Sequence, residues 1–138
     1  MTTQCSIDVR YPDCDPMGIV HHAVYPLWYE IARMDFFDKI GMPYSDTHAR
    51  GVDPAMVSFN LTYAAPVRFP GTVTVRTRLL SCAPKKLELA YEVWQEGDEK
   101  PRAAATSFHI WTGPDMRSYD MAANYPEAWD KICAALDG

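Results

Sequence analysis

Apolar and polar residues alternate along most of the second half of the chain, which predicts β-strands whose two faces differ in polarity. The alternating runs are residues 57–63, 73–79, 87–93 and 102–112. Turn-forming residues at 82–85 and 97–101 separate the last three runs, and both gaps are short enough for hairpins. Ile7, Val9 and Tyr11 alternate with polar neighbours and predict one more strand near the start.

A different period governs residues 22–40, where apolar residues recur at the spacing of an α-helix. The residues expected on one face are Val24, Leu27, Trp28, Ile31, Asp35 and Phe36. Pro26 lacks an N–H and fits only in a first turn, so the helix should begin near residues 21–23. Gly41 and Pro43 provide the stop. Residues 126–136 predict a second, shorter helix.

The order is therefore a strand, a long helix and four strands joined mostly by short turns. A four-stranded meander has one apolar face, which one long apolar helix can cover. This predicts an α+β fold in which a sheet wraps around a helix. No internal repeat or linker interrupts the pattern, so residues 1–138 are expected to form a single domain.

Composition narrows the class of protein. The chain is 48% hydrophobic and 22% charged, as in a globular domain, and no apolar stretch is long enough to span a bilayer. A net charge of −5 argues against nucleic-acid binding. The four cysteines are scattered without a C-x-x-C pair, which indicates thiols rather than a disulfide framework or a zinc site. No secretory signal is visible, so a cytoplasmic location without membrane insertion is expected.

The segment between the first strand and the long helix gathers most of the candidate chemistry. It places Asp13, Cys14, Asp15, His21 and His22 beside a helix N-terminus, whose free amides can bind an anion or polarise a carbonyl. The same residues also suit turns, caps and a solvated surface. A metal site is disfavoured because adjacent helical side chains point about 100° apart. A nucleophilic thiol lacks a base at a recognisable spacing.

The string D-C-D-P-x-G-I-V at residues 13–20, followed by His22 and Tyr25, resembles the signature of the hot-dog-fold acyl-CoA thioesterases. The resemblance is nearest to the 4-hydroxybenzoyl-CoA thioesterase group and to the short-chain acyl-CoA thioesterases of bacterial Tol-Pal operons. It extends to Glu30-x-x-Arg33, to A-P-V-R at residues 65–68 and to the order of the elements. It implies a hot-dog fold, in which an antiparallel sheet wraps around one long helix.

The resemblance also implies roles for individual residues. Asp15 would attack the thioester carbonyl or activate water, and carboxylates are anionic at neutral pH. The backbone amide near His22 would polarise the carbonyl, and the His22 side chain would hydrogen-bond the thioester or protonate the leaving thiolate. Gly18 would keep the turn tight and let the backbone approach the ligand. Asp13 is assigned to structure, as a turn residue or a partner of Arg10. No cofactor or metal is implied.

Substrate binding is expected at two further places. Lys85 and Lys86, in a turn between strands, would hold the phosphates of CoA, although a solvated turn explains them equally well. Leu87 stands where relatives often have a hydroxyl residue. Tyr25 and Trp28, with Tyr29 and Phe36, would line an acyl pocket or would belong to the core. The further basic candidates are Arg68, Arg76, Arg78 and Arg102.

The partner implied by the resemblance is an acyl-CoA substrate whose acyl group the sequence does not specify. Members of the family form homodimers, often paired into homotetramers, with interfacial active sites, and residues 54–60 of a second chain would then contribute. Two other classes remain open. One is a non-catalytic acyl-CoA-binding module of the same fold. The other is a hydratase or dehydratase, which the segment at residues 13–18 disfavours.

Overall fold

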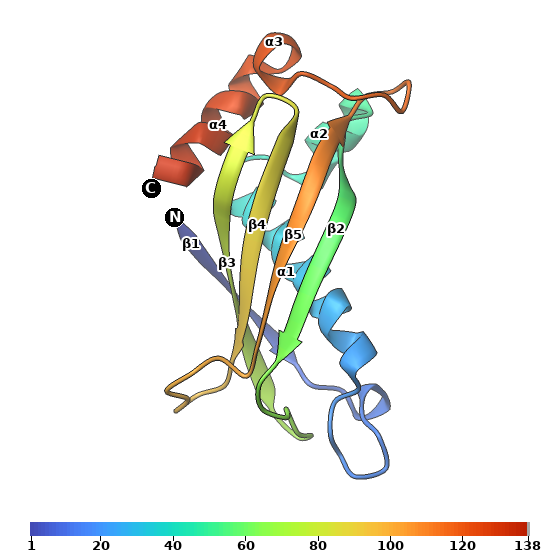
Figure 1. Cartoon of the computed structure of the whole chain (residues 1–138), viewed down its shortest axis with the longest axis vertical. Coiled ribbons are helices and arrows are strands. Elements are labelled where there is room, and N and C mark those ends of the chain that lie inside the picture. The colour runs from blue at the N-terminus through green and yellow to red at the C-terminus, as the bar shows by residue number, and fades with distance from the viewer. Residues whose placement is uncertain (138) are drawn as a thin grey trace.

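A five-stranded antiparallel sheet forms one layer of the molecule (Figure 1). The computed structural model describes residues 1–137. The strands are β1 (Thr2–Asp8), β2 (Asp53–Tyr63), β3 (Thr72–Ala83), β4 (Lys86–Trp94) and β5 (Ala103–Thr112). Their order across the sheet is β1-β3-β4-β5-β2. The two predicted hairpins join β3 to β4 and β4 to β5 and are confirmed. The predicted four-stranded meander is wrong for its first strand, because β2 pairs with β5 at one edge of the sheet and β1, not β2, lies beside β3.

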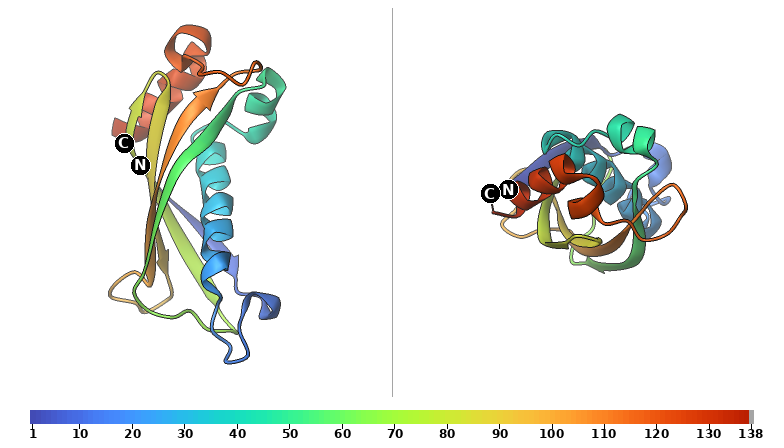
Figure 2. Two further views of the ribbon diagram at one scale, coloured as in Figure 1. Left: turned by 45° about the vertical axis from the view of Figure 1, so that its right-hand side comes forward. Right: turned by 90° about the horizontal axis from the view of Figure 1, so that it is seen from above.

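The long helix α1 (Tyr25–Lys39) lies along one face of the curved sheet (Figure 2). A 3-10 turn, η2 (His22–Val24), leads into it, so the helical conformation begins where Pro26 predicted. Gly41, with φ of +90°, follows its end in the left-handed region that glycine tolerates. One helix covered by a wrapped antiparallel sheet is the predicted α+β hot-dog architecture.

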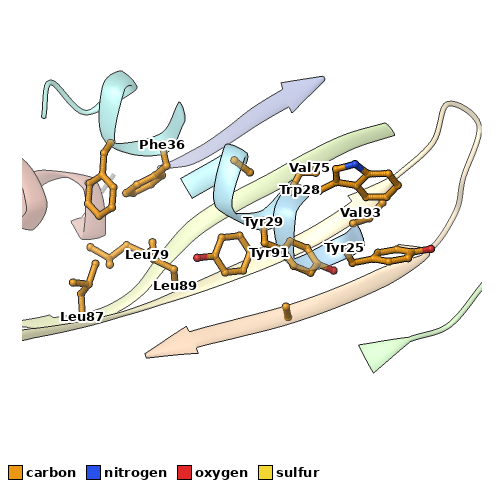
Figure 3. Close-up of a cluster of buried hydrophobic side chains, with 14 of the residues drawn as sticks. Tyr25, Trp28, Tyr29, Phe36, Val75, Leu79, Leu87, Leu89, Tyr91 and Val93 are labelled. Carbon is orange, nitrogen blue, oxygen red and sulfur yellow. The ribbon is translucent and has the colours of Figure 1, made fainter. Parts of the chain in front are cut away.

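Aromatic side chains from α1 fill the space between the helix and the sheet (Figure 3). The buried residues of the helix are Tyr25, Trp28, Tyr29, Ala32, Phe36 and Phe37. The predicted face was partly wrong, because Leu27 and Ile31 are 54% and 49% exposed. The apolar residues of α1 occupy more than one side of the helix, and only the aromatic side meets the sheet. The inward positions of β3 and β4 are buried in strict alternation, as predicted.

Three further differences concern element ends and short helices. The first strand ends at Asp8, and Tyr11 lies exposed in a 3-10 turn, η1 (Tyr11–Asp13). Pro12 is the second residue of that turn, where its fixed φ suits a helical start and its missing N–H has no partner to lose. Helices α2 (Tyr44–Arg50) and α3 (Met121–Asn124) were not predicted, because they are too short for a clear apolar period. The predicted C-terminal helix is confirmed as α4 (Pro126–Asp137).

Candidate active site

The segment that carries Asp15 folds into a tight hairpin between η1 and α1. Cys14 bridges Val20, the Asp15 amide donates to the Ile19 carbonyl at 2.9 Å, and the Gly18 amide donates to the Asp15 carbonyl at 3.0 Å. Gly18 has φ of +75°, so the predicted tight turn needs a residue without Cβ strain at this position. Asp15 therefore stands at the first position of a four-residue turn.

Two hydrogen bonds fasten this hairpin to the segment that precedes β3. The Phe69 amide donates to the Gly18 carbonyl at 3.0 Å, and the Val20 amide donates to the Val67 carbonyl at 2.9 Å. Ile19 also forms a bridge with Arg68. The turn is thus held against the body of the molecule at the end of the sheet where β3 begins.

The Asp15 carboxylate has one oxygen engaged in the turn and one that is not. Its Oδ1 accepts the Met17 amide at 2.8 Å and the Ile19 amide at 3.1 Å. Among the described residues, no hydrogen bond reaches Oδ2. The side chain is half-buried in a turn whose tip, Met17, projects into solvent. A carboxylate held in this way keeps a fixed direction while one oxygen stays available.

Asp13 has the structural role that the sequence assigned to it. Its buried carboxylate receives both Arg10 Nη2 at 2.8 Å and Arg10 Nε at 3.1 Å. The two guanidinium hydrogen bonds lower the pKa of Asp13, so the carboxylate stays charged. Because both of its oxygens are occupied, Asp13 is not a rival of Asp15 for catalysis.

Cys14 lies in surroundings that disfavour a thiolate. Partial burial raises the pKa of the Cys14 thiol, and the neighbouring charges of Asp13 and Asp15 raise it further. The Sγ atom lies 3.6 Å from the Arg10 carbonyl, where the protonated thiol donates. A reactive cysteine requires the opposite electrostatic setting.

His22 is the first residue of η2 and is exposed to solvent. The first amides of a helical turn have no acceptor within the turn, so this position can donate a backbone N–H to a ligand. The His22 carbonyl accepts the Tyr63 hydroxyl at 2.9 Å, which ties the turn to the end of β2. A hollow of about 290 Å³ lies beside it and is lined by Ile19, Val20, His22, Tyr25, Tyr63 and Pro66.

The imidazoles of His21 and His22 lie next to each other, with ring centroids 5.1 Å apart. Within residues 1–137, no group of three or more His, Cys, Asp or Glu side chains is arranged to hold a metal ion. None of the described helices is both long and apolar enough to cross a bilayer.

Tyr25 and Trp28 both belong to the core, with ring centroids 5.0 Å apart. Tyr25 also reaches the hollow beside His22, and its ring meets that of Tyr63 edge-on at 5.0 Å. Trp28 instead borders a groove between α1 and β1, together with Leu27 and Ile31. The two residues therefore do not line one common pocket in the single chain.

Lys85 lies in the predicted turn and Lys86 is the first residue of β4, but both are far from Asp15. The Asp15 hairpin is fastened just before the start of β3, whereas the lysine pair follows its end. A strand of 12 residues at about 3.3 Å per residue spans roughly 40 Å, which is longer than an extended CoA. The two ends of the long axis of Figure 1 are thus occupied by the two candidate groups.

The sequence analysis did not identify Tyr63 at the candidate site, and it did not assign Arg68 a position there. Tyr63 holds the His22 carbonyl, but in the sequence it is only one position of an alternating strand. Arg68 was one of several basic candidates, and the structure places it against Ile19 of the Asp15 hairpin. Neither contact has a signal in the sequence, because both join segments more than 40 residues apart.

Comparison with known proteins gives the class to which this fold and hairpin belong. The family model described as "Thioesterase-like superfamily" matches residues 9–129. The chain belongs to this superfamily. It is 35% identical over 104 residues to the putative acyl-CoA thioesterase YneP of Bacillus subtilis, covering 75% of each chain. It is 25% identical over 128 residues to the 4-hydroxybenzoyl-CoA thioesterase of a Pseudomonas species, covering 86% of this chain and 91% of that one.

Solved structures agree with this assignment. The hypothetical protein TT1821 of Thermus thermophilus superposes with a TM-score of 0.87 at 33% identity, covering 98% of both chains. A DHNA-CoA thioesterase from Staphylococcus aureus gives a TM-score of 0.86 at 26% identity, covering 96% of this chain and 91% of that one. The predicted hot-dog fold, family resemblance and enzyme class, a thioester hydrolase, are confirmed. The roles of individual site residues stay predictions.

Proposed function

We propose that this protein hydrolyses the thioester of an acyl-CoA to the free acid and CoA, with Asp15 as the reacting carboxylate. The observation that carries this assignment is the hairpin of residues 14–20, which presents the Asp15 side chain shortly before the first free amides of η2. A carboxylate followed by unpaired amide donors supplies both parts that thioester hydrolysis needs, an attacking group and a site for the developing oxyanion.

Asp15 has two possible routes. In the first, its carboxylate attacks the carbonyl carbon and forms a mixed anhydride, CoA leaves as a thiolate that takes up a proton, and water then cleaves the anhydride. In the second, Asp15 removes a proton from a water molecule that attacks the carbonyl directly. In both routes, the backbone amide near His22 donates to the carbonyl oxygen. The exposed His22 imidazole is the proton donor for the thiolate.

Substrate positions follow from the same geometry. Gly18 allows the turn to approach the thioester closely, since no side chain projects there and φ is +75°. Tyr25 borders the hollow beside His22, where we place the acyl group. Trp28 contributes from the groove on the other side of α1. Lys85 and Lys86 of one chain bind the phosphates of a CoA whose thioester lies at Asp15 of a second chain, because the two groups lie too far apart within one chain.

A homodimer supplies that second chain, and pairing of two dimers gives a homotetramer. The outer edge of β2 pairs with no strand among residues 1–137, and Met56 and Val57 are exposed on it. If two β2 edges pair antiparallel about a two-fold axis, the Tyr63 end of one strand meets the Asp53 end of the other. The hollow beside His22 then faces the start of the partner's β2, within residues 54–60.

The second candidate function is a non-catalytic acyl-CoA-binding module on the same fold. The free oxygen of Asp15 favours the enzyme, because a merely structural turn residue has no need of it. No disulfide joins any of the four cysteines within residues 1–137, which fits the expected cytoplasmic location.

Turnover of an acyl-CoA panel tests the proposal. The panel contains short, branched, long and aryl acyl groups, and the released thiol is followed with a chromogenic reagent. We expect hydrolysis of at least one class with a kcat/KM in the ordinary range for enzymes, from about 10⁴ M⁻¹s⁻¹ upward. Binding of acyl-CoA without turnover of any class would instead establish the binding module.

A further inference from the structure

No helix covers the face of the sheet opposite α1 (Figure 2). This face contains a basin of about 550 Å³. Side chains of β3 and β2 form two opposite walls, and small residues of β4 and β5 form the floor. The walls are formed by Arg76 and Arg78 and by Asn60 and Thr62, and the floor by Ala90 and Ala104. Glu92 of β4 is the acidic residue of the lining. Three strand spacings of about 4.8 Å separate the walls, so the basin is roughly 14 Å wide.

Arg76 is held in place on the basin wall without an acidic partner. Its guanidinium lies over the ring of Trp94, with Cζ 4.3 Å from the ring centroid. Its Nε is buried and makes no hydrogen bond to any described residue. A buried guanidinium nitrogen without an acceptor is costly, because its interaction with water has been lost and not replaced.

Glu92, the acidic neighbour of Arg76 in the basin, forms no ion pair with it among the described residues. Glu92 is the cross-strand partner of Arg76, but its Oε1 accepts the Trp94 indole N–H at 3.3 Å. Among the ion pairs of residues 1–137, none includes Arg76 or Arg78. Residues two positions apart in a strand lie on one face about 7 Å apart, so the basin wall presents two unpaired cations side by side.

We propose that this basin binds a phosphate-bearing small molecule, at a site separate from the Asp15 hairpin. Guanidinium groups match phosphate oxygens with paired N–H donors, and a diphosphate between Arg76 and Arg78 removes their mutual repulsion. It also gives the buried Nε of Arg76 an acceptor. Asn60 on the opposite wall adds a neutral hydrogen-bonding group without negative charge.

The same chemistry has two sources, the phosphates of CoA itself and those of another phosphorylated metabolite. The chain as a whole carries a charge of −5, so its general field repels both. Binding therefore depends on the local pair of arginines. It does not depend on thioester hydrolysis, which makes the two proposals separately testable.

Calorimetric titration with inorganic pyrophosphate and with ADP tests the site. We expect saturable binding to the wild-type protein, weakened at least tenfold by Arg76→Gln and by Arg78→Gln. Arg117→Gln is the matched control, because Arg117 is exposed in the loop after β5 and its loss changes the net charge equally. We expect this control to bind within twofold of wild type. Glu92→Gln keeps an acceptor for Trp94 and should tighten binding severalfold.

Kinetics with two substrates then identifies the source. If the basin holds the phosphates of CoA, Arg76→Gln raises KM for an acyl-CoA at least tenfold but leaves KM for the matching acyl-N-acetylcysteamine, which lacks phosphates, unchanged. If it holds another metabolite, both KM values stay unchanged while pyrophosphate binding is lost.

The proposal is overturned if pyrophosphate, ADP and CoA all fail to saturate the wild type. It is also overturned if Arg117→Gln weakens binding as much, or if the arginine variants change only the oligomeric state.

Discussion

At the scale of single residues, two neighbouring aspartates with the same chemistry have different roles. Their roles differ according to how many of their carboxylate oxygens accept hydrogen bonds from the protein. Both oxygens of Asp13 receive Arg10, whereas only Oδ1 of Asp15 is engaged in the turn. The turn needs an acceptor at this position but not a charge, so structure and catalysis can be separated by substitution.

The first prediction concerns the stability of the Asp15 hairpin. Asp15→Asn keeps an Oδ1 acceptor for the Met17 and Ile19 amides, so its melting temperature should stay close to that of wild type. Asp15→Ala leaves both amides without their acceptor and should lower the free energy of unfolding by about 1–3 kcal/mol. Thermal and urea unfolding measure both. Equal losses in the two variants would mean that the charge itself holds the turn.

The sequence could predict the residues of this site but not their geometry. The resemblance selected Asp15 and assigned Asp13 to Arg10, and the ion pair confirms the second assignment. The contact of Tyr63 with His22 joins β2 to η2, and a pattern along one strand contains no information about such a pair. The cause is physical: an alternating pattern fixes which face a side chain occupies but not what lies opposite it.

At the scale of elements, a buried chain of hydrogen bonds joins α1 to three strands. Arg33 Nη1 donates to the Tyr91 hydroxyl at 3.1 Å, which lies 2.7 Å from Ser107 Oγ. Ser107 Oγ lies 2.7 Å from His109 Nε2, and His109 Nδ1 lies 3.0 Å from the Pro54 carbonyl. A carbonyl only accepts, so the neutral His109 carries its proton on Nδ1 and its Nε2 accepts from the Ser107 hydroxyl. Ser107 then accepts from the Tyr91 hydroxyl, which accepts from Arg33, since arginine only donates.

This chain supports a second prediction. Tyr91→Phe removes the acceptor of Arg33 and the donor to Ser107 and should cost about 1–3 kcal/mol of unfolding free energy. Tyr29→Phe is the matched control, because the Tyr29 ring lies 5.1 Å from that of Tyr91 while its buried hydroxyl bonds to no described residue. That variant should be neutral or slightly stabilising. Equal effects of the two substitutions would show that the chain contributes nothing.

The pH dependence of stability gives a third prediction. Burial lowers the pKa of His109 from its ordinary value of 6.5 to about 4. Between these values the unfolded chain binds a proton that the native protein does not, so stability falls as the pH decreases from 6.5 towards 4. The loss from this group is about 3 kcal/mol. Urea unfolding across this range should show it, and His109→Gln should have a shallower slope. A parallel slope would contradict the assignment.

Much of the arrangement of elements followed from the sequence, because alternation and helical period are local. The exceptions are the place of β2 beside β5 instead of β3, the exposed side of α1 and the buried polar residues of β5. The apolar residues of α1 extend around more than one side, so the pattern did not show that Leu27 and Ile31 face solvent. Ser107 and His109 occupy inward positions of β5, where polar residues interrupt the apolar pattern. Their partners lie on other elements, so the sequence did not reveal the buried hydrogen bonds.

At the scale of the whole molecule, one chain separates two groups that are proposed to bind one substrate. Asp15 and the lysine pair lie beyond opposite ends of β3, about 40 Å apart by strand length. The number of residues between Asp15 and the lysine pair did not reveal this separation. Consecutive antiparallel strands run in opposite directions, so the chain returns to the same end of the sheet after every second strand. A second chain placed along the β2 edge runs in the opposite direction and brings unlike ends together. The site proposed for this protein is therefore a property of the assembly.

The fourth prediction tests that assembly. Val57→Glu places a charge on the exposed edge of β2, where the wild-type side chain is 55% exposed, so the single chain should fold normally. We expect it to run as a monomer in light scattering and to lose at least 90% of its thioesterase activity. Met116→Glu, at an 83% exposed loop position, introduces the same charge elsewhere and should change neither property. An active monomeric Val57→Glu protein would contradict the interfacial site.

If Asp15 carries the hydrolysis, steady-state kinetics of Asp15→Asn should show a loss in kcat. The variant keeps the turn but lacks the carboxylate charge, so kcat should fall by a factor of about 10³ or more with KM nearly unchanged, since the loss is confined to the transition state. Cys14→Ser, one residue away, should retain near wild-type kcat. The account is contradicted if Asp15→Asn hydrolyses the substrate at close to the wild-type rate while Cys14→Ser does not.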